Sequence, residues 1–443
     1  MIEACLTRNN NSVCFEAFKV KNVDYYVFNI VYISILFMYF KFTPLNAETQ
    51  PLIVLAFTPI MLLAKFAKRI KFTRSERYLV LFWLVLLAYG LLSLLLFKQD
   101  VSKVFLYSLR LLVMPLAYLL FLKNTHYLSP NSLRFALYVL LIVAFVEFFK
   151  IPILNDALEL LYNRFFERFT FGEGSRGLCI LTTEPSYFVY FAILLVYSID
   201  FLSISKKLSK KESTIYRLLI ILIGLLTKSA FVYLFILIYV GQRLILHFAK
   251  RKRISILICF LFVFLPLAFY LIMNVPIPQA DNRFLQAANS IIQSVKTNGL
   301  IDTLFFADAS GGFRLIINSI YLLSIFLYPF GTGYGGLTEK WLYVSNHFNI
   351  DVTQNGHFLY SVGLDAALDA QAYIPNLVGT IGLFTLLFLA FLYTGNNQRN
   401  RWLRYSILFV VSLFLWFLQS NFFNPVFWIV IGIAKNNKVL LNR

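Results

Sequence analysis

Two arginines and two candidate bases lie in polar stretches between long apolar runs. Arg176 and Glu184 belong to FGEGSRGLCILTTEPSYFVY (171–190), and Arg314 and His357 belong to a later polar region. A guanidinium group is a fixed cation with a planar fork, which suits bidentate binding of phosphate or diphosphate. A carboxylate or an imidazole can accept the proton of a sugar hydroxyl group. These residue types predict a diphosphate-binding site beside a general base.

Each of these residues also has a purely structural explanation. Arg176 can pair with a nearby carboxylate or with lipid headgroups, and Arg314 can extend its charge into water from a helix end. Glu184 precedes Pro185, which suits the first turn of a helix. The carboxylate of Glu184 can therefore cap its own helix. A loop histidine such as His357 is more often solvated than catalytic.

Three further charged residues lie within or beside apolar runs. Lys228 occupies the tight turn LLTKSAF (225–231), from which its ammonium group can reach a headgroup plane. Arg110 and Glu147 lie inside apolar runs. Charges within a membrane are costly and are functional candidates by default, so Arg110 is a candidate substrate-binding residue. An ion pair between Arg110 and Glu147 is the structural alternative.

The composition predicts a membrane protein. Of the 443 residues, 59% are hydrophobic and 14% are charged, whereas a soluble domain is about one quarter charged. The mean hydropathy is +0.73. The four cysteines have no metal-binding spacing, and no small-residue cleavage site follows the polar N-terminal stretch. We therefore expect an all-α polytopic membrane protein with no cofactor and no metal.

About twelve transmembrane helices must position the candidate residues. A membrane span takes about 20 mostly apolar residues, and some spans are shorter. The predicted spans are Tyr25–Lys41, Pro51–Phe66, Leu79–Phe97, Val104–Leu122, Phe135–Ile153, Ser186–Ile204, Ile215–Leu226, Ser229–Leu246, Ile254–Met273, Tyr373–Tyr393, Tyr405–Gln419 and Pro425–Ala434.

The charges between the spans are strongly one-sided. The connections 65–77, 206–217, 247–253 and 396–404, together with the C-terminal tail, carry 21 Lys and Arg residues, and the short connections opposite carry four. Because Lys and Arg accumulate in cytoplasmic loops, both termini are predicted to be cytoplasmic. The formal net charge of +19 is thus explained by topology, and no nucleic-acid partner is expected.

The spans divide the chain into five regions. We expect a five-span membrane region (1–153), a first outer loop (154–185), central spans (186–273), a large second outer loop (274–372), and C-terminal spans with a cytoplasmic tail (373–443). The second loop contains FRLIINSIYLLSIFLYPFG (313–331). A thirteenth span there would invert all later segments against the charge bias, so we expect an interfacial helix.

Four short motifs follow one another between residues 170 and 390. They are Arg176-Gly177 followed by Glu184-Pro185-Ser186, then LLTKS (225–229), then GGFR (311–314) leading to PFGTGYG (329–335), and last NLVGTIGLF (376–384). In this order, and with the span pattern, the chain resembles the bacterial O-antigen and exopolysaccharide repeat-unit polymerases (Wzy-type), which are related to the O-antigen ligases. The first five spans add only hydropathy to this resemblance.

The resemblance implies a metal-independent glycosyltransferase at the outer face of the bacterial cytoplasmic membrane. Its donor would be an undecaprenyl-diphosphate-linked oligosaccharide, used to build a lipopolysaccharide O-antigen, a capsule or an exopolysaccharide. Membrane lipids and a chain-length regulator are the other implied partners. Arg176, Arg314 and Lys228 would bind the diphosphate, and Glu184 or His357 would be the base. Aromatic residues of the outer loops, such as Tyr334, Trp341 and Tyr360, could stack on sugars, and Tyr187 is a further possible substrate-binding residue.

The chain departs from the family pattern at two positions. Many relatives place arginine directly after the Thr-x-Ser serine, where this chain has Ala230, so Lys228 is a possible substitute. They often carry a histidine just before the late span, where this chain has Asp369 and Gln371. The role of any histidine is therefore open.

Three other functions fit the same sequence. A ligase that moves finished polymer to another acceptor shares the chemistry. A flippase or other secondary transporter for lipid-linked oligosaccharides shares the span number, although transporters often show internal repeats and charges at the midplane. A scaffolding membrane protein with no active site is the third alternative.

Overall fold

The computed structural model describes a helical protein. The described residues are 11–39, 52–66, 72–95, 101–162, 177–182, 184–250, 309–350, 352, 368–394, 401–418 and 424–436. Within these ranges no β-strand occurs, which confirms the all-α expectation for the described part of the chain.

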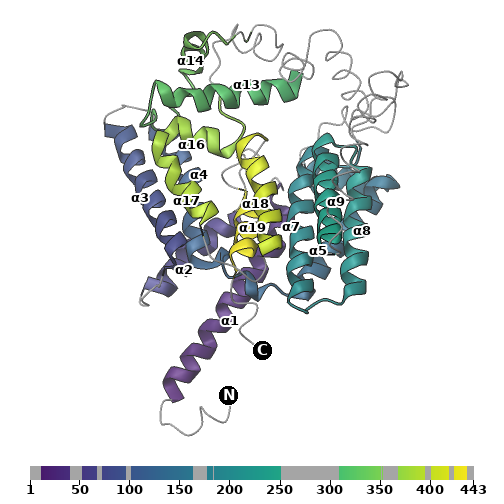
Figure 1. The fold of residues 1–443 in the computed structure, drawn as a ribbon. Coiled ribbons are helices and arrows are strands. Elements are labelled where there is room, and N and C mark those ends of the chain that lie inside the picture. Colours follow the sequence, from purple (N-terminus) through teal and green to yellow (C-terminus); the bar gives the residue numbers. More distant parts are fainter. Residues whose placement is uncertain are drawn as a thin grey trace, which may run out of the picture.

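The described residues form fifteen α-helices, and short 3-10 or π turns extend several of them (Figure 1). The α-helices are α1 (Asn11–Ser34), α2 (Leu52–Phe66), α3 (Arg74–Leu95), α4 (Val101–Ala117), α5 (Pro130–Phe148), α6 (Pro152–Tyr162), α7 (Phe188–Ile204), α8 (Lys210–Leu226), α9 (Ala230–Lys250), α13 (Ala309–Leu323), α14 (Trp341–His347), α16 (Tyr373–Ile381), α17 (Thr385–Tyr393), α18 (Arg401–Trp416) and α19 (Pro425–Lys435).

Several of these helices suit a membrane. Helices cover most of eleven of the twelve predicted spans, and the remaining range, 254–273, lies outside the described residues. Several of these spans are covered by shorter apolar helices of 10–17 residues. Five helical stretches of the described part are long and apolar enough to cross a bilayer, namely Arg74–Leu95, Pro130–Phe148, Pro185–Ile204, Phe231–Phe248 and Tyr373–Tyr393, of which the last joins α16 and α17 through a short 3-10 turn.

Helix α7 is the centre of the bundle. Every residue from Phe188 to Leu202 is buried, as expected for a helix that is apolar on all sides and enclosed by others. It packs against α5, α8, α9 and α19. In Figure 1 it lies between the α18–α19 pair and the α8–α9 pair. Helix α7 begins at Phe188, shortly after Glu184, so its close packing fixes the position of Glu184.

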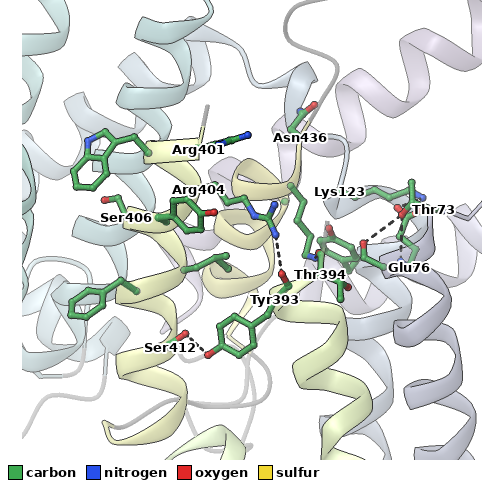
Figure 2. Close-up of a pocket in the computed structure, with 18 of the residues that line it drawn as sticks. Thr73, Glu76, Lys123, Tyr393, Thr394, Arg401, Arg404, Ser406, Ser412 and Asn436 are labelled. Atoms are coloured by element: carbon green, nitrogen blue, oxygen red, sulfur yellow. Dashed lines mark hydrogen bonds and ion pairs between the residues drawn. The ribbon is translucent and has the colours of Figure 1, made fainter. Parts of the chain in front are cut away.

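The two ends of the bundle differ in character. One end, which we call the basic end, is lined by Arg74, Lys123, Arg401, Arg404 and Lys435 around a cavity (Figure 2). The start of α1 and the end of α19 lie toward this end in Figure 1. The other end, which we call the motif end, contains Gly177–Thr182, Leu226–Ser229, Phe330–Tyr334 and Thr380–Phe384. The helices therefore separate the cationic loop ends from the four motifs.

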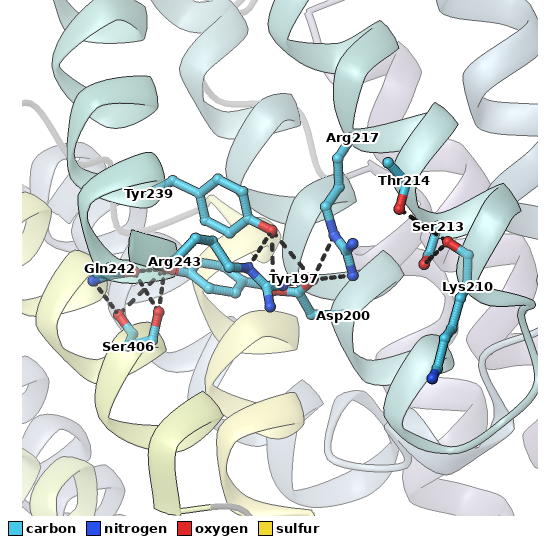
Figure 3. A network of polar contacts seen from close by, with 10 residues as sticks. All are labelled: Tyr197, Asp200, Lys210, Ser213, Thr214, Arg217, Tyr239, Gln242, Arg243 and Ser406. Atoms are coloured by element: carbon cyan, nitrogen blue, oxygen red, sulfur yellow. Dashed lines mark hydrogen bonds and ion pairs between the residues drawn. The ribbon is translucent and has the colours of Figure 1, made fainter. Parts of the chain in front are cut away.

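A buried ion-pair network ties four helices together near the basic end (Figure 3). Asp200 of α7 is 4% exposed and forms ion pairs with Arg217 of α8, at 2.9 Å, and with Arg243 of α9. The hydroxyl of Tyr239 donates to the same carboxylate at 3.2 Å. Ser406 brings α18 into the network through the hydroxyl of Tyr197, one turn before Asp200. Asp200 thus clamps α7, α8 and α9 together.

Helix α13 lies across the motif end of the bundle, as Figure 1 shows. Together with the following 3-10 turn it spans Ala309–Phe326, close to the interfacial helix expected at 313–331. It is partly amphipathic, and its buried side packs on the chain that follows it. This second, smaller core contains Ile316, Ile317, Ile320, Tyr321, Leu337, Trp341 and Val344.

The span predicted as continuous over Tyr373–Tyr393 is interrupted at Gly382. This residue has φ +57°, and a Cβ there would lie 2.0 Å from the carbonyl oxygen of Pro329. The backbone N–H of Leu383 donates to the same oxygen at 2.8 Å. Only glycine allows both this φ and this close approach. The helix is broken because a distant segment docks onto it.

Candidate functional site

The first two motifs are in direct backbone contact. Gly177 has φ +82°, and a Cβ on it would lie 2.3 Å from the carbonyl oxygen of Thr227. The backbone N–H of Leu178 donates to the carbonyl of Leu226 at 3.1 Å. Glycine is required at 177 because no side chain fits between the two backbones. The segment after Arg176 is therefore fixed on the α8–α9 turn.

That turn is tight and holds Lys228. The hydroxyl of Thr227 donates to the carbonyl of Gly224 at 2.7 Å, which closes the last turn of α8. Lys228 follows with φ +49°, a left-handed conformation that is uncommon for a residue with a side chain. It is partly exposed. A cation is thereby held directly beside the Gly177 segment.

Glu147 at the end of α5 holds the same segment from the other side. Its carboxylate is 6% exposed and accepts the backbone N–H groups of Cys179, at 2.9 Å, and of Ile180, at 3.1 Å. Ile180 and Leu181 both have left-handed φ, +46° and +57°. Such strain in a branched residue persists only where its surroundings impose it, and it gathers at functional sites.

This role of Glu147 differs from the ion pair weighed from the sequence. A carboxylate inside an apolar run marked Glu147 as a functional candidate, but the sequence does not show which backbone N–H groups it would bind. The side chain of Arg110 lies outside the described residues, so the structure describes only the Glu147 side of that predicted pair. We assign Glu147 as a positioning residue for the segment between Gly177 and Thr182.

Glu184 stands at the start of the short 3-10 turn Pro185–Tyr187, with extended backbone (φ −139°). Its side chain makes no capping hydrogen bond to that turn. The hydroxyl of Ser186 lies 3.4 Å from the carboxylate, and the hydroxyl of Thr182 lies 2.6 Å from the Glu184 carbonyl oxygen. Capping of its own helix, the structural alternative, therefore does not describe this half-buried carboxylate.

Arg314 on α13 connects the third motif to the second. Its guanidinium carbon lies 4.9 Å from the centre of the Phe231 ring, within range of a cation–π interaction. Phe231 belongs to α9 and is only three residues after Lys228. Lys228 of the α8–α9 turn and Arg314 of α13 thus lie at the same end of the bundle.

The helix that carries Arg314 is anchored one turn further on. The Asn318 side chain accepts the backbone N–H groups of Gln371 and Ala372, both at 3.0 Å, and donates to the carbonyl of Phe417 at 3.2 Å. Residues four apart share one face of a helix, so these contacts fix the face that carries Arg314. They also bring α13 to Asp369, whose carboxylate accepts the hydroxyl of Tyr107.

The third and fourth motifs dock through their glycines. A Cβ on Gly331 would lie 2.3 Å from the carbonyl oxygen of Thr380. The backbone N–H of Thr332 donates to the carbonyl of Gly379 at 2.9 Å, and that of Gly333 donates to Thr380 at 3.1 Å. The glycine-rich segment GTGYGG therefore docks on the broken helix α16–α17 through backbone hydrogen bonds.

The described aromatic candidates lie in packed surroundings. Tyr334 is 0% exposed, and its hydroxyl donates to the carbonyl of Leu86 in α3. Trp341 is 3% exposed within the smaller core. Tyr187 is 8% exposed and stacks on Tyr39 with ring centres 5.3 Å apart. In this structure the three rings pack against other parts of the protein, and their role in binding sugars stays a prediction.

Two predicted site residues, Arg176 and His357, and the aromatic Tyr360 lie outside the described residues. Within the described ranges no three His, Cys, Asp or Glu side chains lie close enough to hold a metal. Among the charged candidates, the structure describes the side chains of Lys228, Arg314 and Glu184. Glu147 holds the backbone of Cys179 and Ile180, and Asn318 holds that of Gln371 and Ala372.

Comparisons with known proteins add no relative. No protein-family model matches this chain, and no curated protein or solved structure matches it.

Proposed function

We propose that this chain is a polysaccharide polymerase of the cytoplasmic membrane. It transfers a growing glycan from undecaprenyl diphosphate onto a carrier-linked repeat unit at the outer face. The observation that carries the proposal is the meeting of the motifs in two docked pairs at one end of the bundle. Gly177 packs on Thr227, Gly331 packs on Thr380, and Arg314 of the second pair reaches Phe231 beside the first.

The proposed topology has twelve spans with both termini in the cytoplasm. It is supported by the division of the bundle into a basic end and a motif end, and by the 21 Lys and Arg residues on one set of connections against four on the other. The motif end then faces outward. Cytoplasmic nucleotide-sugars are not substrates in this topology, and the donor is a lipid-linked glycan already exported.

The proposed chemistry is a direct displacement. A hydroxyl oxygen of the acceptor sugar attacks the anomeric carbon of the donor, and the bond from that carbon to the diphosphate breaks. The leaving lipid diphosphate takes the electron pair, and its charge is stabilised by Arg314, Lys228 and Arg176. Glu184 accepts the hydroxyl proton, and His357 is the second candidate for that role.

The carrier-linked glycan pool of cells lacking the protein tests this function. A polymerase defect leaves single repeat units on their carrier at the outer face. Long carrier-linked polymer that is never attached to an acceptor would instead identify a ligase, and repeat units trapped in the cytoplasmic leaflet would identify a transporter. Either of these two outcomes contradicts the proposal.

A further inference from the structure

A cavity of about 1520 Å³ lies at the basic end, opposite the candidate site. It is bounded by the starts of α3 and α18 and by the ends of α9, α17 and α19, as Figure 2 shows for its polar walls. None of the predicted site residues lines it. Its volume exceeds the roughly 300–1000 Å³ of a typical small-molecule pocket. The transferase proposed above has no use for it.

The lining is strongly cationic. Lys123 and Glu76 form an ion pair at 2.8 Å, with side chains 23% and 10% exposed. Among the described residues that line the cavity, Glu76 is the one carboxylate, against the cations Arg74, Lys123, Arg401, Arg404 and Lys435. Charges gathered in a partly enclosed space are stabilised by an anion of opposite sign.

Two of the cations are held in place by the end of α17. Arg404 donates to the carbonyl of Tyr393 at 2.9 Å, and the ammonium group of Lys435 donates to the carbonyls of Thr394, at 2.8 Å, and of Phe391. The partial negative charge of a helix C-terminus favours both contacts. Because these carbonyls are neutral groups, the formal positive charge of the cavity remains.

An apolar stripe runs inward from the cations. Arg401, Tyr405 and Phe409 are spaced four residues apart on α18 and line the cavity, so they lie on one face of the helix. The stripe extends about 12 Å, at about 1.5 Å per residue. Tyr405 and Phe409 are 60% and 58% exposed, and Ile245 of α9 also lines this space. A cationic mouth followed by an exposed aromatic stripe fits a lipid.

We propose that this cavity binds an anionic phospholipid, with its phosphate headgroup at Arg401 and Arg404 and an acyl chain along Tyr405 and Phe409. Basic pockets between transmembrane helices on the cytoplasmic side are suited to such headgroups. In the proposed topology the lipid comes from the cytoplasmic leaflet. The site is separate from the transferase site, so each proposal stands or fails without the other.

Lipid binding to the purified full-length chain in neutral detergent is the test. The apparent affinity for phosphatidylglycerol is measured by thermal shift in mixed micelles, with phosphatidylcholine as the uncharged comparison. We expect a rise in Tm with phosphatidylglycerol alone. Arg401→Gln should weaken binding about fivefold, and Arg401→Gln combined with Arg404→Gln about 25-fold, at about fivefold for each cation.

The matched control is Arg77→Gln, an exposed arginine of α3 outside the cavity, which should bind as the wild type does. Arg401 is exposed, so its variant keeps the test valid if the double variant fails to fold. Phe409→Ala should weaken binding of the two-chain lipid and leave the response to inorganic phosphate unchanged. Equal stabilisation by inorganic phosphate and by phosphatidylglycerol would overturn the lipid assignment, and equal binding by Arg401→Gln and Arg77→Gln would overturn the site.

Discussion

The two ends of the bundle are built from different contacts. At the motif end, backbone packs directly on backbone at three glycines, Gly177, Gly331 and Gly382, each of which has positive φ and leaves no room for a Cβ. Near the basic end, charged side chains hold the helices, as Asp200 does with Arg217 and Arg243. Backbone contacts fix positions closely and tolerate no side chain at the glycine, whereas ion pairs depend on the charge and the burial of their side chains. We therefore expect each end to be sensitive to a different kind of substitution.

The largest expected effect is that of removing the Asp200 carboxylate, which joins α7, α8 and α9. Asp200→Ala leaves the guanidinium groups of Arg217 and Arg243 beside a vacated carboxylate site, and such a broken buried pair costs about 3–5 kcal/mol. Thermal unfolding of the purified protein measures the effect. The double variant Asp200→Ala with Arg243→Ala should lose less than the sum of the two single variants, because both remove one interaction. Simple additivity would show that the pair contributes nothing.

The next effect tests the backbone contacts. Gly382→Ala forces a side chain against the carbonyl of Pro329 in a backbone region reserved for glycine, and it should lower the free energy of unfolding by about 3 kcal/mol. Gly241→Ala is the matched control, since a Cβ on Gly241 meets nothing within 4 Å in helix α9. That control should be neutral or slightly stabilising. Equal unfolding temperatures for the two variants would refute the docking account.

A smaller effect concerns the anchored segment at the motif end. Glu147→Gln keeps the shape of the side chain but removes the charge that strengthens its bonds to Cys179 and Ile180, a loss of about 1.4 kcal/mol. Cys179 is buried, so its maleimide labelling reports local opening. In a chain whose other three cysteines are serine, labelling should become about tenfold faster. Unchanged labelling would remove Glu147 from its positioning role.

The smallest expected effect concerns an exposed ion pair, which contrasts with the buried ion pairs of Asp200. Arg134 and Glu212 form an ion pair at 2.8 Å with side chains 36% and 35% exposed. Exposed pairs contribute little, because water and salt screen them. Arg134→Ala should therefore leave the Tm unchanged, in contrast to Asp200→Ala. A Tm loss as large as that of Asp200→Ala would mean that burial does not decide which ion pairs matter.

The helices were predictable because long apolar runs determine them. The contacts between distant motifs were not. Gly379 and Gly382 lie within the range Tyr373–Tyr393, but glycine in an apolar run does not by itself predict a break, and the break depends on Pro329 docking at Gly382. The pairing of the segment GTGYGG with α16 also depends on tertiary structure. The order of the four motifs in the sequence suggested that the motifs would meet, but it did not predict the backbone contacts that join them.

The candidate site was predictable in part. The sequence singled out Arg314, Lys228 and Glu184 by residue type, and the structure shows Arg314 over Phe231, close in sequence to Lys228. The sequence could not reveal that Tyr334 would be fully buried, because a tyrosine in a glycine-rich loop carries no sign of packing against α3. The cavity at the basic end was also missed, because loop cations are explained by topology alone until their arrangement is known.

The measurement that tests the account most directly is polymer length in cells carrying Arg314→Ala. Loss of a charge-stabilising group should reduce transfer by about 100-fold or more, so single repeat units should accumulate while the protein remains in the membrane. Arg314→Lys should recover part of the ladder, because it keeps the charge without the planar fork. Phe231→Leu, which removes only the ring beneath Arg314, should keep most of it. A normal ladder in Arg314→Ala at wild-type protein level would contradict the proposed diphosphate site.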